Sequence, residues 1–125
     1  MNKHQCLLCI GSNFEYIEKL SAARIALKHY FPDIIFGKEK KTKAIGNMWL
    51  SPFCNQVAVF NSTLSTENIK IIFKQIEKEN GRTADDKSKG IVKLDIDLLS
   101  YDDMILKPDD ISREYVTESL KELSL

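Results

Sequence analysis

Several features are absent from this sequence, and each absence excludes a class of protein. No run of apolar residues approaches the roughly 18 needed to cross a membrane, and the apolar segment near Met1 is too short for a secretory signal. The 18 Lys and Arg residues balance 18 Asp and Glu residues, so no global field favours nucleic acid or an anionic membrane. We therefore expect a cytoplasmic monomer whose partners are small molecules.

The sequence has three cysteines, an odd number that cannot all pair in disulfides, and this fits a reducing compartment. Cys6 and Cys9 spell C-x-x-C, but they lie in an apolar run, and residues three apart point to opposite faces of a strand. We expect both to be core residues. There is no internal repeat, low-complexity tract, G-x-G-x-x-G or Walker motif. With 125 residues and 43% hydrophobic content, the chain fits a single domain, residues 1–125.

Periodicity in what remains predicts the secondary structure. Alternation or short apolar runs predict strands over residues 5–11, 34–43, 53–60 and 92–101. Three- and four-residue spacing predicts helices over 14–31 and 65–80, and a short amphipathic helix from about residue 112. Ser12 or Asn13 would cap the first helix, and residues 44–52 and 82–90 are expected to form mobile loops.

The order of these elements, strand, helix, strand, strand, helix, strand, is typical of one architecture. It predicts an α+β fold of the ferredoxin-like type, a split βαβ sandwich with an antiparallel sheet. Both main helices would cover one face of this sheet and leave the other face available.

Asp95 and Asp97 stand two residues apart in the predicted strand 92–101, opposite its apolar row. Side chains at i and i+2 leave the same face of a strand about 7 Å apart, so the two carboxylates would lie side by side and repel. A divalent cation would relieve this, and Mg²⁺ prefers one or two carboxylates plus substrate phosphates. The alternative is an edge strand with solvated acids, because D-x-D alone is a weak motif.

Two other polar residues in predicted elements leave alternatives open. Asn55 lies among apolar residues, where a buried amide would either hold loop backbone or read the edge of a heterocycle. Glu77 lies in the last turn of a helix, where an acid opposes the dipole, so it is either functional or simply solvated. The apolar cluster over residues 45–50 would cap a flat ligand or pack into the core.

The order of elements, together with the residues at their joints, resembles the 6-hydroxymethyl-7,8-dihydropterin pyrophosphokinase family of folate biosynthesis. The segments that carry the resemblance are Ile10-Gly11-Ser12-Asn13, Thr42, Phe53-Cys54-Asn55-Gln56-Val57, Ile76-Glu77, Gly81-Arg82 and the strand Leu94 to Tyr101. The chain itself looks like a short and divergent member of this family. The resemblance implies an enzyme that transfers pyrophosphate from ATP to the pterin and releases AMP. ATP would be the co-substrate, and two Mg²⁺ ions would be required.

The resemblance also implies roles for individual residues. Asp95 and Asp97 would bind the metal ions and, with Arg82, would be catalytic. The residues implied to bind the pterin substrate are Thr42, Phe53, Asn55 and Tyr115. The residues implied to bind the nucleotide are Glu77, Lys89, Leu98 and Arg113.

Several basic positions of the family are not basic here. Val92 replaces an Arg before the Leu-Asp strand, and Ala84, Ser88 and Lys89 replace a basic stretch that carries a Trp. Lys87, Lys89 or Lys93 could supply charge, but a lysine cannot reproduce a bidentate Arg clamp. An alternative is therefore a non-catalytic or weakly active relative that binds a pterin or nucleotide. An RNA-binding ferredoxin-like module is disfavoured, because the strand at the site presents acids.

Overall fold

The sheet of this protein is antiparallel and is built outward from β1 (His4–Ser12), the strand at its centre. β1 pairs on one side with β4 (Phe53–Ser62) and on the other with β5 (Asp95–Tyr101). Short strands complete the sheet: β2 (Ile35–Phe36) and β3 (Lys40–Thr42) pair with β4, and β6 (Met104–Ile105) pairs with β5. The structure is a computed structural model that describes residues 2–42 and 52–123, apart from the side chain of Lys87.

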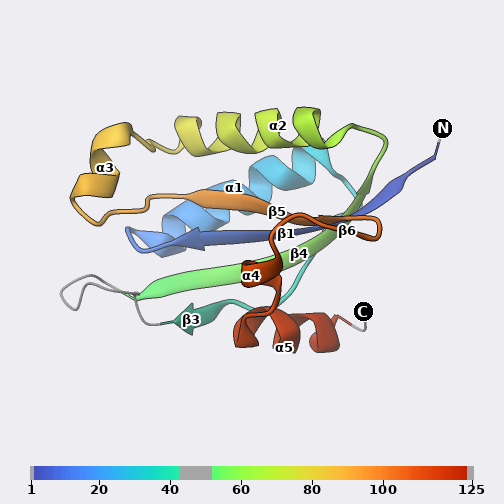
Figure 1. Cartoon of the computed structure of the whole chain (residues 1–125). Helices are drawn as coiled ribbons and strands as arrows, with labels where there is room; N and C mark the ends of the chain where they lie inside the picture. The colour runs from blue at the N-terminus through green and yellow to red at the C-terminus, as the bar shows by residue number, and fades with distance from the viewer. Residues whose placement is uncertain (1, 43–51, 124–125) are drawn as a thin grey trace.

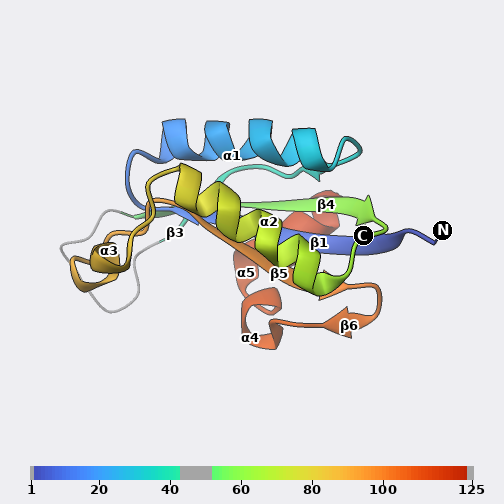
Figure 2. The ribbon, with the colours of Figure 1, turned by 90° about the horizontal axis from the view of Figure 1, so that it is seen from above.

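Two long helices, α1 (Tyr16–Tyr30) and α2 (Thr66–Glu79), lie side by side on one face of the sheet (Figures 1 and 2). Between helices and sheet lies the main core, in which the rings of Phe31, Phe60 and Phe73 pack with centroids 4.3–6.3 Å apart. Ser65 caps α2 by accepting a hydrogen bond from the amide of Asn68. The predicted α+β, ferredoxin-like architecture is therefore confirmed.

The opposite face of the sheet is covered in part, whereas the sequence predicted that it would be left available. α4 (Pro108–Ile111) and α5 (Glu114–Glu122) lie against it (Figure 1). Val116 of α5 packs into a second, smaller core with Leu7, Cys9, Val57 and Leu99. The short amphipathic helix was expected, but its apolar row does not reveal which face of the sheet it covers.

Two predictions about individual residues can be compared with the cores and helix ends. Cys6 lies in the main core and Cys9 in the second core, so the C-x-x-C pair does point to opposite faces. Residues 82–90, expected to form a mobile loop, instead contain α3 (Ala84–Ser88). At the start of this helix the Asp86 carboxylate accepts the Thr83 amide at 3.0 Å. The predicted apolar cluster at residues 45–50 lies outside the described part of the chain. None of the described helices is both long and apolar enough to cross a membrane.

Asn13 does not cap α1, because Glu15 occupies the N-cap position. Its side chain instead joins the end of β1 to the segment before β5. Asn13 Nδ2 donates to the Gly90 carbonyl at 2.9 Å, and Asn13 Oδ1 accepts the Val92 amide at 2.6 Å. The backbone amide of Asn13 donates to the Val92 carbonyl at 2.9 Å. The buried residue Asn13 therefore holds the segment that leads into β5.

We expect Asn13→Ala to lower the free energy of unfolding by about 1–3 kcal/mol, because the Val92 amide and Gly90 carbonyl lose their partner in a buried setting. Chemical denaturation would measure this. Asn2→Ala, at an exposed position near the N-terminus, is the control. An Asn13→Ala protein as stable as the parent would show that the contact does not hold this segment.

Candidate active site

Because side chains alternate along β5, its two carboxylates lie on one face of the sheet and its apolar row lies on the other. Asp95, Asp97 and Leu99 project to the face that α5 covers in part, while Ile96 and Leu98 project into the main core. Within the described part of the chain, β6 pairs only with Ser100 and Tyr101. The outer edge of β5 is therefore open beside the two aspartates.

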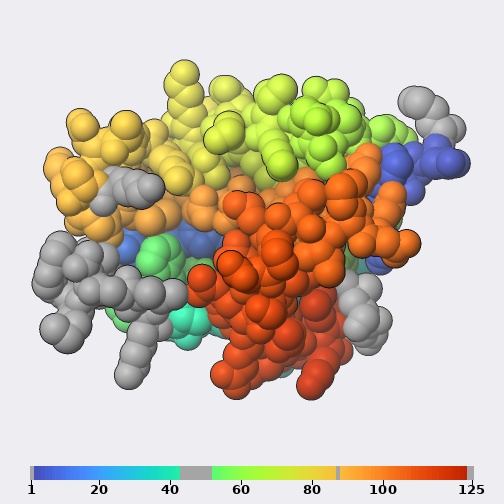
Figure 3. All heavy atoms as spheres, in the orientation of Figure 1, coloured from blue at the N-terminus to red at the C-terminus, as the bar shows by residue number. Residues whose placement is uncertain are grey.

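On one side of the aspartates lies a hollow that we call the β4 hollow. Its volume is about 490 Å³, within the range of small-molecule sites. It is lined by Cys9, Gly11, Thr42, Phe53, Asn55, Asp95, Asp97, Leu99, Asp110, Arg113, Glu114, Tyr115 and Val116. Figure 3 shows atoms of β1 and β4 at the bottom of a depression between β5 and α5.

An amide and a hydroxyl meet on the wall of the β4 hollow. Asn55 Nδ2 donates to Thr42 Oγ1 at 2.9 Å, and the Asn55 side chain is almost completely buried. A Cβ at Gly11 would lie 3.0 Å from Asn55 Oδ1, so glycine at position 11 leaves room for this amide. Phe53 and Tyr115 add aromatic surface from β4 and α5. The four predicted pterin-binding residues therefore line one hollow.

On the other side of the aspartates lies the α2 hollow, between α2 and the open edge of β5. Its volume is about 400 Å³, so it too can hold part of a small molecule. It is lined by Lys70, Phe73, Lys74, Glu77, Arg82, Asp95, Ile96, Asp97, Leu98 and Lys107. Asp95 and Asp97 thus belong to both hollows.

Glu77 and Arg82 hold β5 from the α2 side. Glu77 is buried, and its Oε2 accepts the amide of Ile96, the residue between the two aspartates, at 2.7 Å. Arg82 Nη1 lies 2.7 Å from Asp95 Oδ1 and 3.2 Å from Glu77 Oε1. Burial raises the pKa of Glu77, while the Ile96 amide and the Arg82 charge oppose that rise. Glu77 is therefore not a solvated surface acid.

The carboxyl group of Asp97 is strongly perturbed by its surroundings. Burial, followed by the hydrogen bond and charge of Asp95, raises the pKa of Asp97 from 3.8 to about 7. Among the described residues, no group of three His, Cys, Asp or Glu side chains could hold a metal ion. Two carboxylates that open onto a hollow with basic residues instead fit Mg²⁺, which completes its coordination with water and phosphate oxygens.

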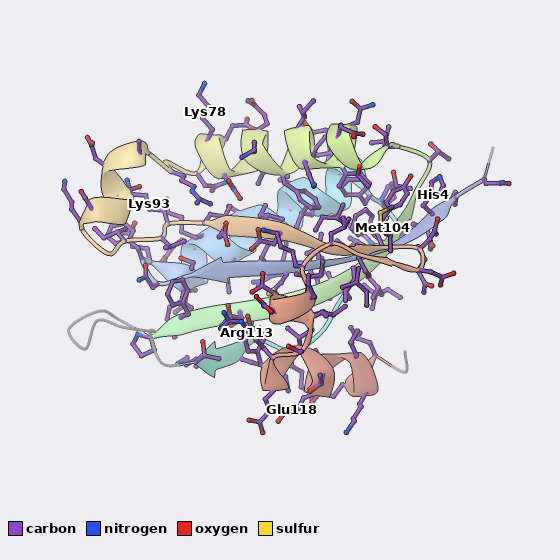
Figure 4. The ribbon with its side chains drawn as sticks, in the orientation of Figure 1. His4, Lys78, Lys93, Met104, Arg113 and Glu118 are labelled. Carbon is purple, nitrogen blue, oxygen red and sulfur yellow. The ribbon has the colours of Figure 1, made fainter. Side chains whose placement is uncertain are left out.

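Three residues that the sequence analysis singled out do not line the α2 hollow. Lys89 is exposed after α3 and lines neither hollow. Arg113 lines the β4 hollow with Tyr115, not the α2 hollow, and its Nε lies 3.3 Å from Asp110 Oδ1 (Figure 4). Val92 faces a separate depression on the far side of Arg82. Leu98, by contrast, lines the α2 hollow.

Sequence reasoning missed the lysines of the α2 hollow, Lys70, Lys74 and Lys107. Lys70 and Lys74 stand four residues apart, and this spacing on a predicted helix was a usable signal. The two lysines looked like part of an ordinary charged helix face, because the sequence does not show which helix face borders β5. Lys107 is brought close by the amides of Leu106 and Lys107, which both donate to the Leu99 carbonyl.

The fold and the site define an α+β protein of the ferredoxin-like type with an acidic centre between two ligand-sized hollows. The family model described as 7,8-dihydro-6-hydroxymethylpterin-pyrophosphokinase (HPPK) matches residues 7–125. The chain therefore belongs to the HPPK family, and the resemblance inferred from its motifs is confirmed. A comparison with curated proteins gives no match.

The raised pKa of Asp97 has a consequence for stability. Between pH 3.8 and about 7 the folded state keeps a proton that the unfolded state has released, so the stability of the metal-free protein should fall as pH rises through this range. Asp97→Asn removes this cost. After allowance for solvent screening, we expect the variant to be about 1–3 kcal/mol more stable than the parent near pH 8, and little different near pH 4.

Thermal or chemical denaturation at the two pH values measures the difference. Asp103→Asn, in the exposed turn between β5 and β6, is the control and should show no such pH-dependent gain. An Asp97→Asn protein less stable than the parent near pH 8 would contradict mutual repulsion of the aspartates.

Proposed function

We propose that this chain is a pyrophosphokinase that transfers the β,γ-pyrophosphoryl group of ATP to the hydroxymethyl group of 6-hydroxymethyl-7,8-dihydropterin in folate biosynthesis. The membership of the HPPK family gives the reaction class. The observation that carries the proposal for this chain is that Asp95 and Asp97 line both hollows at once. A ligand group bound at these two carboxylates would be accessible from both the β4 hollow and the α2 hollow.

The two hollows differ in chemistry as the two substrates differ. The β4 hollow offers the rings of Phe53 and Tyr115 and the amide of Asn55, which suit a flat heterocycle with a polar edge. The α2 hollow combines Lys70, Lys74 and Lys107 with apolar Leu98, which suits a nucleotide with its polyphosphate. We assign the pterin to the β4 hollow and ATP to the α2 hollow.

In the proposed reaction the pterin hydroxyl oxygen forms a bond to the β-phosphorus, and the bond from that phosphorus to the α,β-bridging oxygen breaks. AMP leaves with that oxygen, and the hydroxyl proton goes to solvent. Magnesium ions on Asp95 and Asp97 would offset negative charge on the transferred phosphates. The chain's own contribution is to hold two carboxylates between the substrates and to orient the pterin through Asn55 and Thr42.

A second candidate is a relative that binds a pterin or nucleotide without efficient transfer. The observation that favours it is that Ala84 and Val92 are uncharged where the family resemblance implies a basic segment, because arginine next to a transferring phosphate strongly accelerates such reactions. Arg82 is present, but it is paired with Asp95 and Glu77. The two candidates differ in one measurable product, AMP.

We expect AMP to form only when ATP, Mg²⁺ and the pterin alcohol are all present. Asp95→Asn should lower the rate by about 100-fold or more, because it removes one of two charges that hold the metal ions. Chromatographic separation of AMP from ATP and ADP measures this, and Asp103→Asn is the control. Binding of both ligands by the parent without AMP formation would reject the transfer and favour the second candidate.

Asn55→Ala should weaken pterin binding by about 1–3 kcal/mol, because the polar edge of the heterocycle would be left without a partner in a buried site. Calorimetry with the pterin alcohol, Mg²⁺ and a non-hydrolysable ATP analogue measures this. Asn61→Ala, an exposed amide at the other end of β4, is the matched control. Equal pterin affinity in Asn55→Ala and the parent would remove Asn55 from the pocket assignment.

A further inference from the structure

Of the three lysines that the sequence offered as sources of charge, Lys89 and Lys93 line neither hollow, and the side chain of Lys87 lies outside the described part of the structure. Lys93 Nζ donates to the Gly81 carbonyl at 3.0 Å and lies 3.5 Å from Asp86 Oδ1, at the α3 end of the molecule (Figure 4). Its ammonium group also lies over the ring of Phe14. Among the described side chains, the positive charge that borders the two hollows therefore comes from other segments.

Three lysines converge on the α2 hollow from two sides. Lys70 and Lys74 lie one turn apart on α2, and Lys107 follows β6 on the far side of β5. Within residues 2–42 and 52–123, none of their ammonium groups forms an ion pair. The remaining cation of this hollow, Arg82, is already paired with Glu77 and Asp95.

The β4 hollow has the opposite charge. Besides the shared aspartates it is lined by Asp110 and Glu114, and its one described basic residue, Arg113, is paired with Asp110. A chain of phosphates placed there would face the acids Asp97 and Glu114, which form no ion pair among the described residues. The same phosphates in the α2 hollow would face three ammonium groups, with the shared aspartates at one end.

We infer that Lys70, Lys74 and Lys107 form a polyphosphate clamp in a chain that has no arginine at positions 84 and 92. This inference rests on the proposed function, because it assigns the donor's phosphates to the α2 hollow. The clamp is made from point charges on flexible side chains and lacks the fixed fork of arginine. Polyphosphate binding should therefore depend strongly on ionic strength, since these lysines are exposed.

The test measures, by calorimetry, how tightly the full chain binds inorganic tripolyphosphate in the presence of Mg²⁺. Lys70→Ala, Lys74→Ala and Lys107→Ala should each weaken binding about five- to tenfold, the loss expected for one charge-assisted contact. Lys→Arg at the same positions should restore it. The same alanine substitutions should weaken the binding of AMP, which has one phosphate, less than they weaken the binding of tripolyphosphate.

Lys78→Ala is the matched control, because Lys78 belongs to the same helix but does not line the α2 hollow, and Figure 4 shows it pointing away from the sheet. Its tripolyphosphate affinity should equal that of the parent. Equal melting temperatures of all variants would exclude a loss of fold as the cause.

AMP formation from ATP and the pterin alcohol, measured on the same variants, separates the two proposals. Tripolyphosphate binding that depends on the three lysines, without any AMP formation, would reject the proposed function and leave the clamp standing. AMP formation and tripolyphosphate binding that are both unchanged in the lysine variants would reject the clamp and leave the function standing. A parent that does not bind tripolyphosphate would also overturn the clamp.

Discussion

The repulsion between Asp95 and Asp97 is the constraint on which the rest of the site depends. Strand alternation forces both carboxylates to one face of β5, and partial burial raises the pKa of Asp97 to about 7. Such a pair costs stability unless a cation relieves it. The fold keeps the pair all the same, as expected for a site where stability is given up for function.

The neighbouring elements hold this unfavourable pair in place by contacts to backbone, not by neutralising both charges. Glu77 binds the amide between the two aspartates, Arg82 binds only Asp95, and Asn13 holds the segment before β5. Each contact comes from a different part of the chain, namely α2, the segment after α2 and the end of β1. The carboxylates are therefore positioned before any ligand arrives, which is the arrangement that electrostatic catalysis requires.

The ferredoxin-like order was predictable from the sequence, because alternation in β5 and helical spacing in α2 are local signals. Contacts between distant segments were not. The sequence does not show that α5 covers the second sheet face, that Asn13 reaches Val92, or that the lysines of α2 border β5. The motif residues Asp95, Asn55 and Thr42 were found because their family spacing is recognisable, whereas Lys70 resembles any surface lysine. Side chains that only the fold brings to the border of β5 leave no motif in the sequence.

The most direct test of this account is the location of the bound metal. With Mn²⁺ in place of Mg²⁺, paramagnetic broadening of backbone amide signals should be strongest at Asp95, Ile96 and Asp97 and should extend into both hollows, to Asn55 on one side and Arg82 on the other. The chain offers competing acid pairs at Asp85 and Asp86, Asp102 and Asp103, and Asp109 and Asp110. Broadening centred on one of those pairs, or confined to one hollow, would contradict the claim that Asp95 and Asp97 form a metal centre shared by two substrates.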